Sequence, residues 1–150
     1  MKRVFKKLDG TIVNVINHTL QIMSEHPDVE IHVGTDSQNQ GSRTSYSTVI
    51  AYRYGSRGAH IIVSNQKVPR IRDFWSRLWK EAELSVETAE WITKQINVRI
   101  EIDMDYNCDK VHKSSSLVNA AKGWANSLGY KVNIKPDNQI ATKAADAQCR

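Results

Sequence analysis

Carboxylates follow two runs of residues that are typical of β-strands. Asp36 comes directly after the β-branched run 29–35, and Asp103 and Asp105 lie on the polar side of the alternating run 98–106. In α/β sheets, ligands bind in the crevice outside the carboxyl ends of the strands. If the two strands are neighbours, we expect these acidic side chains to lie close together at that crevice.

Another carboxylate, Glu81, lies near the apolar face of a predicted helix over residues 73–97. At about 100° per residue, Glu81 points roughly 50–60° from the centre of the apolar stripe. Glu83, Glu87 and Glu90 point away from that stripe. A carboxylate at the edge of a buried face costs free energy unless it is paired or bound to a metal. Taken alone, Glu81 is explained more simply by an ion pair with a nearby Lys or Arg.

Asp146 completes the set of candidate acids. It follows Ala144 and Ala145, whose small side chains would let a terminal helix approach the sheet closely; the alternative is a solvated residue near a frayed end. Clustered carboxylates repel one another unless a cation neutralises them, and hard oxygen ligands suit Mg²⁺ or Mn²⁺. Two such ions about 3.5–4 Å apart can activate a water and stabilise the leaving oxygen in phosphodiester cleavage.

The elements that must position these acids follow an α/β pattern. Helical periodicity or capping residues predict helices over 11–25, 73–97, 114–128 and 140–148. Strands are predicted over 29–35, 44–54, 59–64, 98–106 and 130–134. The first three strands form an antiparallel meander, and the remainder alternates strand with helix. This order predicts a mixed sheet with helices packed over it.

Composition bounds the class of protein. The chain has 150 residues, which predicts one domain, and a net charge of +5, which favours polyanionic partners. The apolar content excludes disorder, and the absence of a long apolar run excludes a membrane span or a secretory signal. Cys108 and Cys149 form no CxxC pair, so we expect a reduced, cytoplasmic setting. Serine hydrolase, zincin and P-loop signatures are missing.

Basic side chains surround tryptophans at the start of the long helix. Cations contact phosphates, and indoles stack on unpaired bases. The candidates for nucleic-acid binding are Lys67, Arg70, Arg72, Trp75, Arg77, Lys110 and Lys113. A half-buried Trp75 among solvated cations is an equally good explanation. The serines at 114–116, beside the last two lysines, would either cap a helix or bind phosphate at its N-terminus.

Four short motifs resemble those of the ribonuclease H-like superfamily, and its YkuK-type branch in particular. They are GTDSQ at 34–38, RLWKEAELS at 77–85, DMDYN at 103–107 and KPD…AAD at 135–146. The resemblance covers residues 29–150 and implies a five-stranded mixed sheet flanked by helices, with a carboxylate cluster that binds two divalent ions, Mg²⁺ or Mn²⁺. We therefore expect a single domain over 1–150, with residues 1–28 as an N-terminal helical extension of the core 29–150.

The same resemblance assigns the metal ligands and catalytic residues. Asp36 matches the aspartate of the first core strand, Glu81 the glutamate of the first core helix, and Asp146 the aspartate of the final helix. Asp105 matches the fourth-strand aspartate, with Asp103 as the alternative. The resulting hypothesis is a two-metal nuclease acting on DNA, RNA or a hybrid. A non-catalytic nucleic-acid-binding module is the alternative, and a structural adaptor without polyanion affinity is a third class. The sequence favours no oligomeric state.

Overall fold

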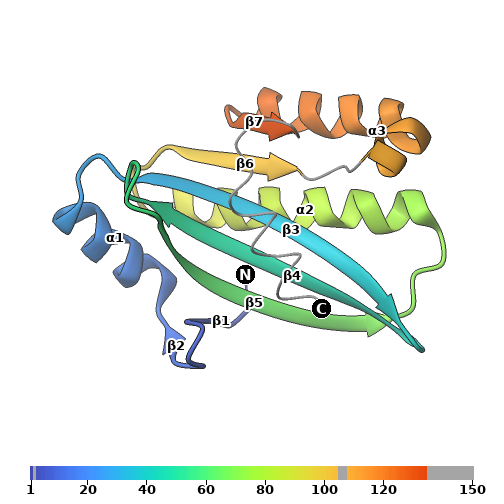
Figure 1. The fold of residues 1–150 in the computed structure, drawn as a ribbon. Coiled ribbons are helices and arrows are strands. Elements are labelled where there is room, and N and C mark those ends of the chain that lie inside the picture. Colours follow the sequence, from blue (N-terminus) through green and yellow to red (C-terminus); the bar gives the residue numbers. More distant parts are fainter. Residues whose placement is uncertain (2, 105–107, 135–150) are drawn as a thin grey trace.

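The computed structural model describes residues 1, 3–104 and 108–134, without the side chains of 108–115. These residues form a sheet in the order β2-β1-β5-β4-β3-β6-β7 (Figure 1). The strands are β1 (Phe5–Lys6), β2 (Ile12–Val13), β3 (Glu30–Gln40), β4 (Arg43–Arg53), β5 (Ala59–Pro69), β6 (Ile100–Met104) and β7 (Lys131–Ile134). The mixed α/β architecture is confirmed. The expected count of five strands is wrong because β1 and β2 extend the sheet beyond β5.

The meander of β3, β4 and β5 is longer than predicted. Each strand has eleven residues, and the β3–β4 ladder continues to the pair Gln40–Arg43. Gly41 begins the hairpin turn with a φ of 58°, a conformation that favours glycine. The polar residues after Asp36 resemble a turn in composition, yet their backbones continue the ladder. Asp36 therefore pairs with Ser47 inside the strand and does not end it.

The strands that carry Asp36 and Asp103 are neighbours, which meets the condition set by the sequence analysis. β6 pairs in parallel with β3, and the register places Asp103 beside Gly34. β7 continues the sheet in parallel, with Asn133 beside Asp103. The connections between these parallel strands contain α2 (Phe74–Thr93) and α3 (Cys108–Ser127). The sheet therefore has the mixed topology that the pattern of elements indicates.

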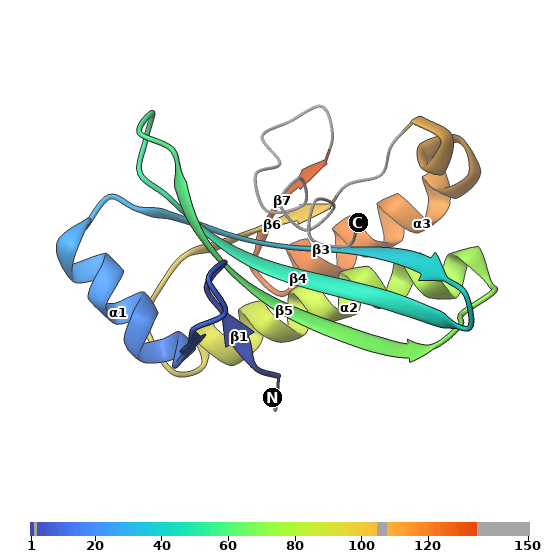
Figure 2. The same cartoon turned by 60° about the horizontal axis from the view of Figure 1, so that its bottom comes forward.

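The described helices cover one face of the sheet. Asp73 caps α2 by accepting the backbone N–H of Ser76, and the apolar stripe of α2 packs against β3. α3 packs beside α2, where Trp124 stacks on Trp79 with ring centroids 5.4 Å apart. Figure 2 shows α2 running along the long strands and α1 (Val15–Glu25) at one end of them. The sheet and these helices share one core.

The N-terminal residues are more than a helical extension. The predicted helix over 11–25 begins only at Val15, capped by Asn14, because residues 12–13 form β2. Inside α1, the Thr19 hydroxyl lies 2.7 Å from that of Tyr52, and both side chains are buried. His18 contacts His60 of β5, with 2.9 Å between their Nε2 atoms. α1 thus packs directly on β4 and β5.

The boundaries of α3 differ from the prediction. The helix begins at Cys108, so residues 114–116 lie inside it and do not cap its start. The helix ends at Ser127, so Leu128 lies outside it and is exposed. Gly129 then reverses the chain with a φ of 94°, a conformation that glycine commonly adopts just after a helix end. Within the described ranges, no helix is sufficiently long and apolar to span a membrane.

The two faces of β3 carry different chemistry. Side chains alternate along a strand, and Thr35 and Ser37 both contact α2. His32 and Asp36 therefore lie on the opposite face, where Val49, Ala51 and Val63 form a second, smaller apolar cluster. Asp36 therefore lies on the face opposite α2, whereas the hydroxyls of Thr35 and Ser37 face α2.

Candidate active site

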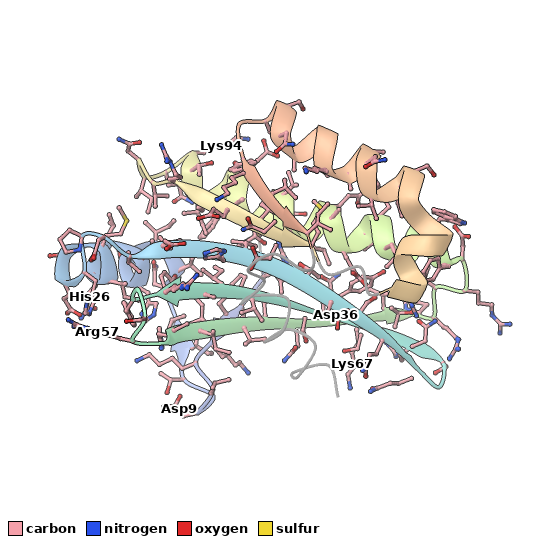
Figure 3. All side chains as sticks on the ribbon, turned by 45° about the horizontal axis from the view of Figure 1, so that its top comes forward. Asp9, His26, Asp36, Arg57, Lys67 and Lys94 are labelled. Atoms are coloured by element: carbon pink, nitrogen blue, oxygen red, sulfur yellow. The ribbon has the colours of Figure 1, made fainter. Side chains whose placement is uncertain are left out.

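Asp36 lies in the middle of β3 and is buried. Its Oδ1 accepts the backbone N–H of Ser37 at 2.9 Å. Beside it in the ladder, the Ser47 hydroxyl donates to Asn65 Oδ1 at 2.5 Å. Figure 3 places Asp36 and Lys67 in the same half of the meander, in agreement with the β4–β5 register. The first predicted ligand therefore has polar neighbours on β4 and a cationic side chain further along β5.

Glu81 reaches β3 from α2 and is buried, as its position on the helix predicts. The Ser37 hydroxyl donates to Glu81 Oε2 at 2.5 Å. One helical turn later, the hydroxyls of Ser85 and Thr35 lie 2.8 Å apart. Burial raises the pKa of the Tyr46 hydroxyl well above its ordinary value, and the nearby charge of Glu81 raises it further. Glu81 is thus a buried carboxylate oriented by a strand hydroxyl.

Ser37 links the two carboxylates. Its backbone N–H binds Asp36 and its side chain binds Glu81, so the two acids approach one residue of β3 from opposite faces of the sheet. The first two ligands that the sequence predicts therefore both contact Ser37. Asp105 and Asp146 lie outside the described residues.

Asp103 has a different set of contacts. It is buried, and its Oδ1 accepts Asn133 Nδ2 at 2.9 Å and lies 3.1 Å from His32 Nδ1. Among the described residues, Asp36, Glu81 and Asp103 do not form a set whose ligand atoms all lie within 4.8 Å of one another. Asp103 thus belongs to a hydrogen-bonded group with His32.

That group includes two glutamates. Glu30 Oε1 lies 3.3 Å from His32 Nε2, and Glu101 Oε2 lies 3.9 Å from the same atom. Burial lowers the pKa of the His32 imidazole, but its hydrogen bond to Asp103 and the surrounding carboxylates outweigh this and raise the pKa. For Glu101, burial opposes ionisation, whereas the hydrogen bond from Asn133 and the charge of His32 lower the pKa.

Sequence reasoning did not assign the glutamates of this group. His32 is on the same side of its strand as Asp36, and Glu30 is on that side too by simple alternation. The signal in the sequence is the spacing Glu-x-His in one strand. The third member, Glu101, becomes apparent only when the parallel register places it beside His32.

The predicted nucleic-acid contacts lie around the start of α2. Lys67, Arg70 and Arg72 are exposed, and Trp75 is 41% exposed, whereas the Arg77 guanidinium lies 5.8 Å from the centre of the Phe74 ring. The side chains of the two predicted lysines in α3 lie outside the described residues. A groove of about 500 Å³ beside Trp75 is lined by Ile71, Trp75, Ser76, Trp79, Lys80, Glu83 and Leu117. This groove combines indole rings with a cation.

The connection that leads into α2 is held to the β3–β4 hairpin by a polar clasp, formed by Asn39, Thr44 and Ile71. Thr44 Oγ1 donates to Asn39 Oδ1 at 2.5 Å and accepts the Ile71 backbone N–H at 2.8 Å. Asn39 Nδ2 donates to the Ile71 carbonyl at 3.3 Å. The clasp fixes the backbone of Ile71, which lies between Arg70 and Arg72 in the chain.

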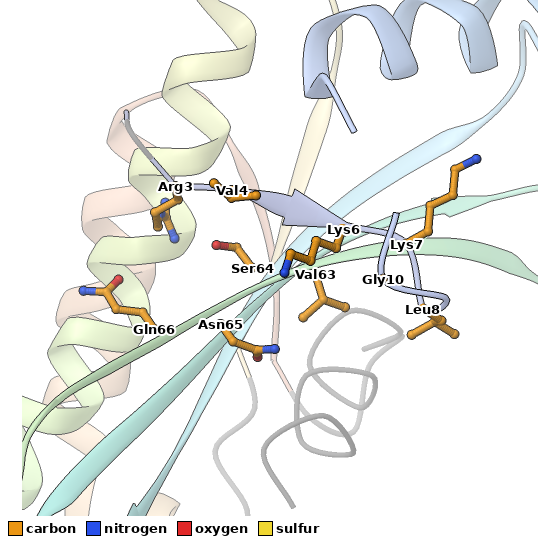
Figure 4. A pocket seen from close by; sticks show the side chains of 10 residues that line it. All are labelled: Arg3, Val4, Lys6, Lys7, Leu8, Gly10, Val63, Ser64, Asn65 and Gln66. Carbon is orange, nitrogen blue, oxygen red and sulfur yellow. The ribbon is translucent and has the colours of Figure 1, made fainter. Parts of the chain in front are cut away.

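The structure also contains a cavity of about 510 Å³ (Figure 4). It is formed around β1 and β5 and is lined by Arg3, Val4, Lys6, Lys7, Leu8, Gly10, Val63, Ser64, Asn65 and Gln66. Its cations fit an anion better than a metal. Among the described candidate ligands, neither Asp36 nor Glu81 nor Asp103 lines it.

Comparison with known proteins supports the resemblance seen in the motifs. The family model described as ribonuclease H-like matches residues 13–150. The match begins before α1, so it includes the helix that we expected to lie outside the core at 29–150. None of the curated proteins matches the sequence. Because the family model matches most of its length, the chain belongs to the ribonuclease H-like family, and its mixed α/β sheet agrees with this.

Proposed function

We propose that the protein is a metal-dependent nuclease that hydrolyses phosphodiester bonds. The observation that carries this proposal is the pair of buried carboxylates, Asp36 and Glu81, joined through Ser37 in a member of the ribonuclease H-like family. Buried carboxylates are costly unless cations or hydrogen bonds compensate them, and oxygen-only ligands fit Mg²⁺ or Mn²⁺.

Four acids would hold two ions in this proposal. Asp36 and Asp105 would share the ions, Glu81 would complete one site, and Asp146 would hold the second ion. Asp105 is preferred to Asp103 because Asp103 belongs to the hydrogen-bonded group with His32 and Asn133. Bound ions of this type activate a water and stabilise the leaving oxygen.

The protein's own residues would orient the site and hold the substrate. Ser37 orients Asp36 with its N–H and Glu81 with its hydroxyl, so both carboxylates are fixed before the metal binds. Lys67 and Arg72 would contact phosphates, and Trp75 would stack on an unpaired base. Cleavage would leave a 3′-hydroxyl and a 5′-phosphate, as the chemistry of the family implies.

A Mg²⁺ titration with labelled DNA, RNA and hybrid strands tests the proposal. We expect cleavage that requires Mg²⁺ or Mn²⁺ and is abolished by Asp36→Asn. Asp28→Asn is the matched control, because Asp28 is an exposed aspartate of the same region. Cleavage that persists in Asp36→Asn, or no cleavage of any strand by the natural sequence, would contradict the proposal.

A nucleic-acid-binding module without turnover is the second candidate. The exposed Trp75 beside the groove and the net charge of +5 favour it. Such a module would bind strands with a steep dependence on salt and leave them intact in Mg²⁺. Binding that does not change between low and moderate salt would instead favour the structural adaptor.

A further inference from the structure

A histidine and two glutamates converge on the face of the sheet opposite the helices. Glu30 and His32 alternate along β3, so both project to the same side, and the parallel register places Glu101 of β6 beside His32. Their ligand atoms, Nε2 of the histidine and one oxygen of each glutamate, all lie within 4.8 Å of one another. The sheet itself brings these three side chains together.

Hydrogen bonds to Asp103 and Asn133 determine which atoms of the histidine and the glutamates face one another. His32 Nδ1 lies 3.1 Å from Asp103 Oδ1, and the tautomer that donates from Nδ1 to this buried side chain has its lone pair on Nε2. Asn133 donates to Asp103 Oδ1 and to Glu101 Oε1, and the Lys131 ammonium lies 3.5 Å from that same Oε1. These contacts leave Nε2 of His32 directed toward Glu30 Oε1 and Glu101 Oε2.

Three electron-rich atoms therefore point at one another. A neutral imidazole with its proton on Nδ1 presents a lone pair at Nε2, and each glutamate oxygen presents another. Such an arrangement is repulsive unless a cation lies between the atoms. Two cations are chemically able to do so, a proton on Nε2 or a metal ion.

The distances suit a metal ion. Zinc-type ions bind nitrogen and oxygen at about 2.0–2.2 Å, which places tetrahedral ligand atoms about 3.3–3.6 Å apart. The separation of Glu30 Oε1 from His32 Nε2, 3.3 Å, already falls in this range, and that of Glu101 Oε2 from Nε2, 3.9 Å, is slightly larger. The Glu30 side chain is about half exposed, so water can reach a fourth position.

The hydrogen bond from His32 to Asp103 is the usual support of a metal-binding histidine. Such residues donate their second ring N–H to a carboxylate, which fixes the tautomer and increases the basicity of the ligand nitrogen. Here Asp103 is in turn held by Asn133. His32 is only 1% exposed, so its ring has little freedom to leave this orientation.

We propose that Glu30, His32 and Glu101 bind one transition-metal dication of the Zn²⁺, Co²⁺ or Mn²⁺ type. The imidazole ligand distinguishes this site from the oxygen-only site at Asp36, because nitrogen ligands favour transition metals over Mg²⁺. The two sites are also separate in space, since His32 and Asp36 are four residues apart on one strand, or about 13 Å. The site does not depend on the proposed nuclease activity.

Co²⁺ is the probe for this site. The full chain, stripped with EDTA and kept in excess Mg²⁺ to occupy oxygen-only sites, is titrated with Co²⁺ at constant pH. Visible absorption reports cobalt in a low-symmetry site, and ¹⁵N spectra of the histidine rings report whether Nε2 of His32 is the ligand. We expect one equivalent to bind and the His32 Nε2 resonance to shift. His32→Gln should abolish this binding, and Glu30→Gln should weaken it at least tenfold.

Two controls separate this inference from the nuclease proposal. Asp28→Asn and Asp36→Asn should both bind Co²⁺ as the natural sequence does, whether or not strands are cleaved. Absence of binding, binding that survives Glu30→Gln unchanged, or binding lost in Asp36→Asn would overturn the inference. Should His32→Gln fail to fold by circular dichroism, Glu30→Gln decides, because Glu30 is exposed and its substitution leaves the core intact.

Discussion

Removing the Tyr52 hydroxyl tests whether α1 belongs to the core of the sheet. In Tyr52→Phe the ring keeps its place, but Thr19 loses the partner that lies 2.7 Å away. Both side chains are fully buried, so water cannot replace the lost bond. Leaving a buried polar group without its partner costs about 1–3 kcal/mol.

This free energy converts into a measurable change in melting temperature. In a chain of this size, 1 kcal/mol corresponds to about 2–4 °C, so Tyr52→Phe should lower the Tm by roughly 2–12 °C. Adding Thr19→Val to Tyr52→Phe removes the hydroxyl that has lost its partner, and it should restore much of the lost melting temperature. A double-mutant cycle of the two changes should give a coupling free energy of about 0.5–3 kcal/mol.

Calorimetry and urea unfolding provide the assay, and Tyr54→Phe is the control. Tyr54 is near the same end of the sheet, but it is half-buried and its ring packs on His26, a contact that phenylalanine keeps. Its substitution should change the Tm little. An unchanged Tm in Tyr52→Phe, or strictly additive effects of the two buried changes, would refute the inference that α1 is coupled to β4 through this bond.

Three further outcomes are expected. Burial, and for His18 also the charge of His60, lowers the pKa of His18 and His60. These two histidines therefore contribute fully to stability above the unfolded pKa of about 6.5, and this contribution is lost as the pH falls below that value. The urea midpoint should decrease over the same pH range, and His60→Gln should make the decrease smaller. Trp75→Ala should weaken binding of single-stranded oligonucleotides by about 1–3 kcal/mol in fluorescence titrations without lowering the Tm, and unchanged affinity would exclude stacking on this indole. Glu81→Gln should slow Mg²⁺-dependent cleavage by about 100-fold or more, since outer-shell partners of a metal alone account for 10–100-fold. Its Tm should be maintained, because the amide oxygen still accepts the Ser37 hydroxyl; a large loss of Tm would indicate a structural role instead.

The burial of Glu81 and the mixed α/β sheet were predictable from the sequence. The rotation per residue along the helix is enough to predict that Glu81 lies near the buried face and that Glu87 points away from it, and Glu87 is exposed in the structure. The mixed sheet follows from the order of strands and helices along the chain. The apolar stripe of the helix and the alternation of strands with helices extend over many residues, so both are clearly visible in the sequence.

Other features leave too weak a pattern. β1 and β2 have two residues each, which is too short for a period of two to be visible. The far half of β3 is polar, and its strand character depends on backbone pairing with β4 rather than on side-chain burial. The place of Glu101 beside His32 depends on the register of two strands that are far apart in the chain. Local patterns do not contain that information.

The polar clasp has a consequence for how the connection before α2 moves. A surface loop normally exchanges its amide hydrogens quickly with solvent, because few contacts oppose its local opening. Here the Ile71 amide is held by Thr44, and the preceding Arg70 amide donates to the Ser42 carbonyl at 3.0 Å. Opening this loop therefore requires several bonds to break together. The arginines should lose only side-chain entropy when they meet a polyanion, and the Ile71 amide should exchange far more slowly than a loop position would indicate.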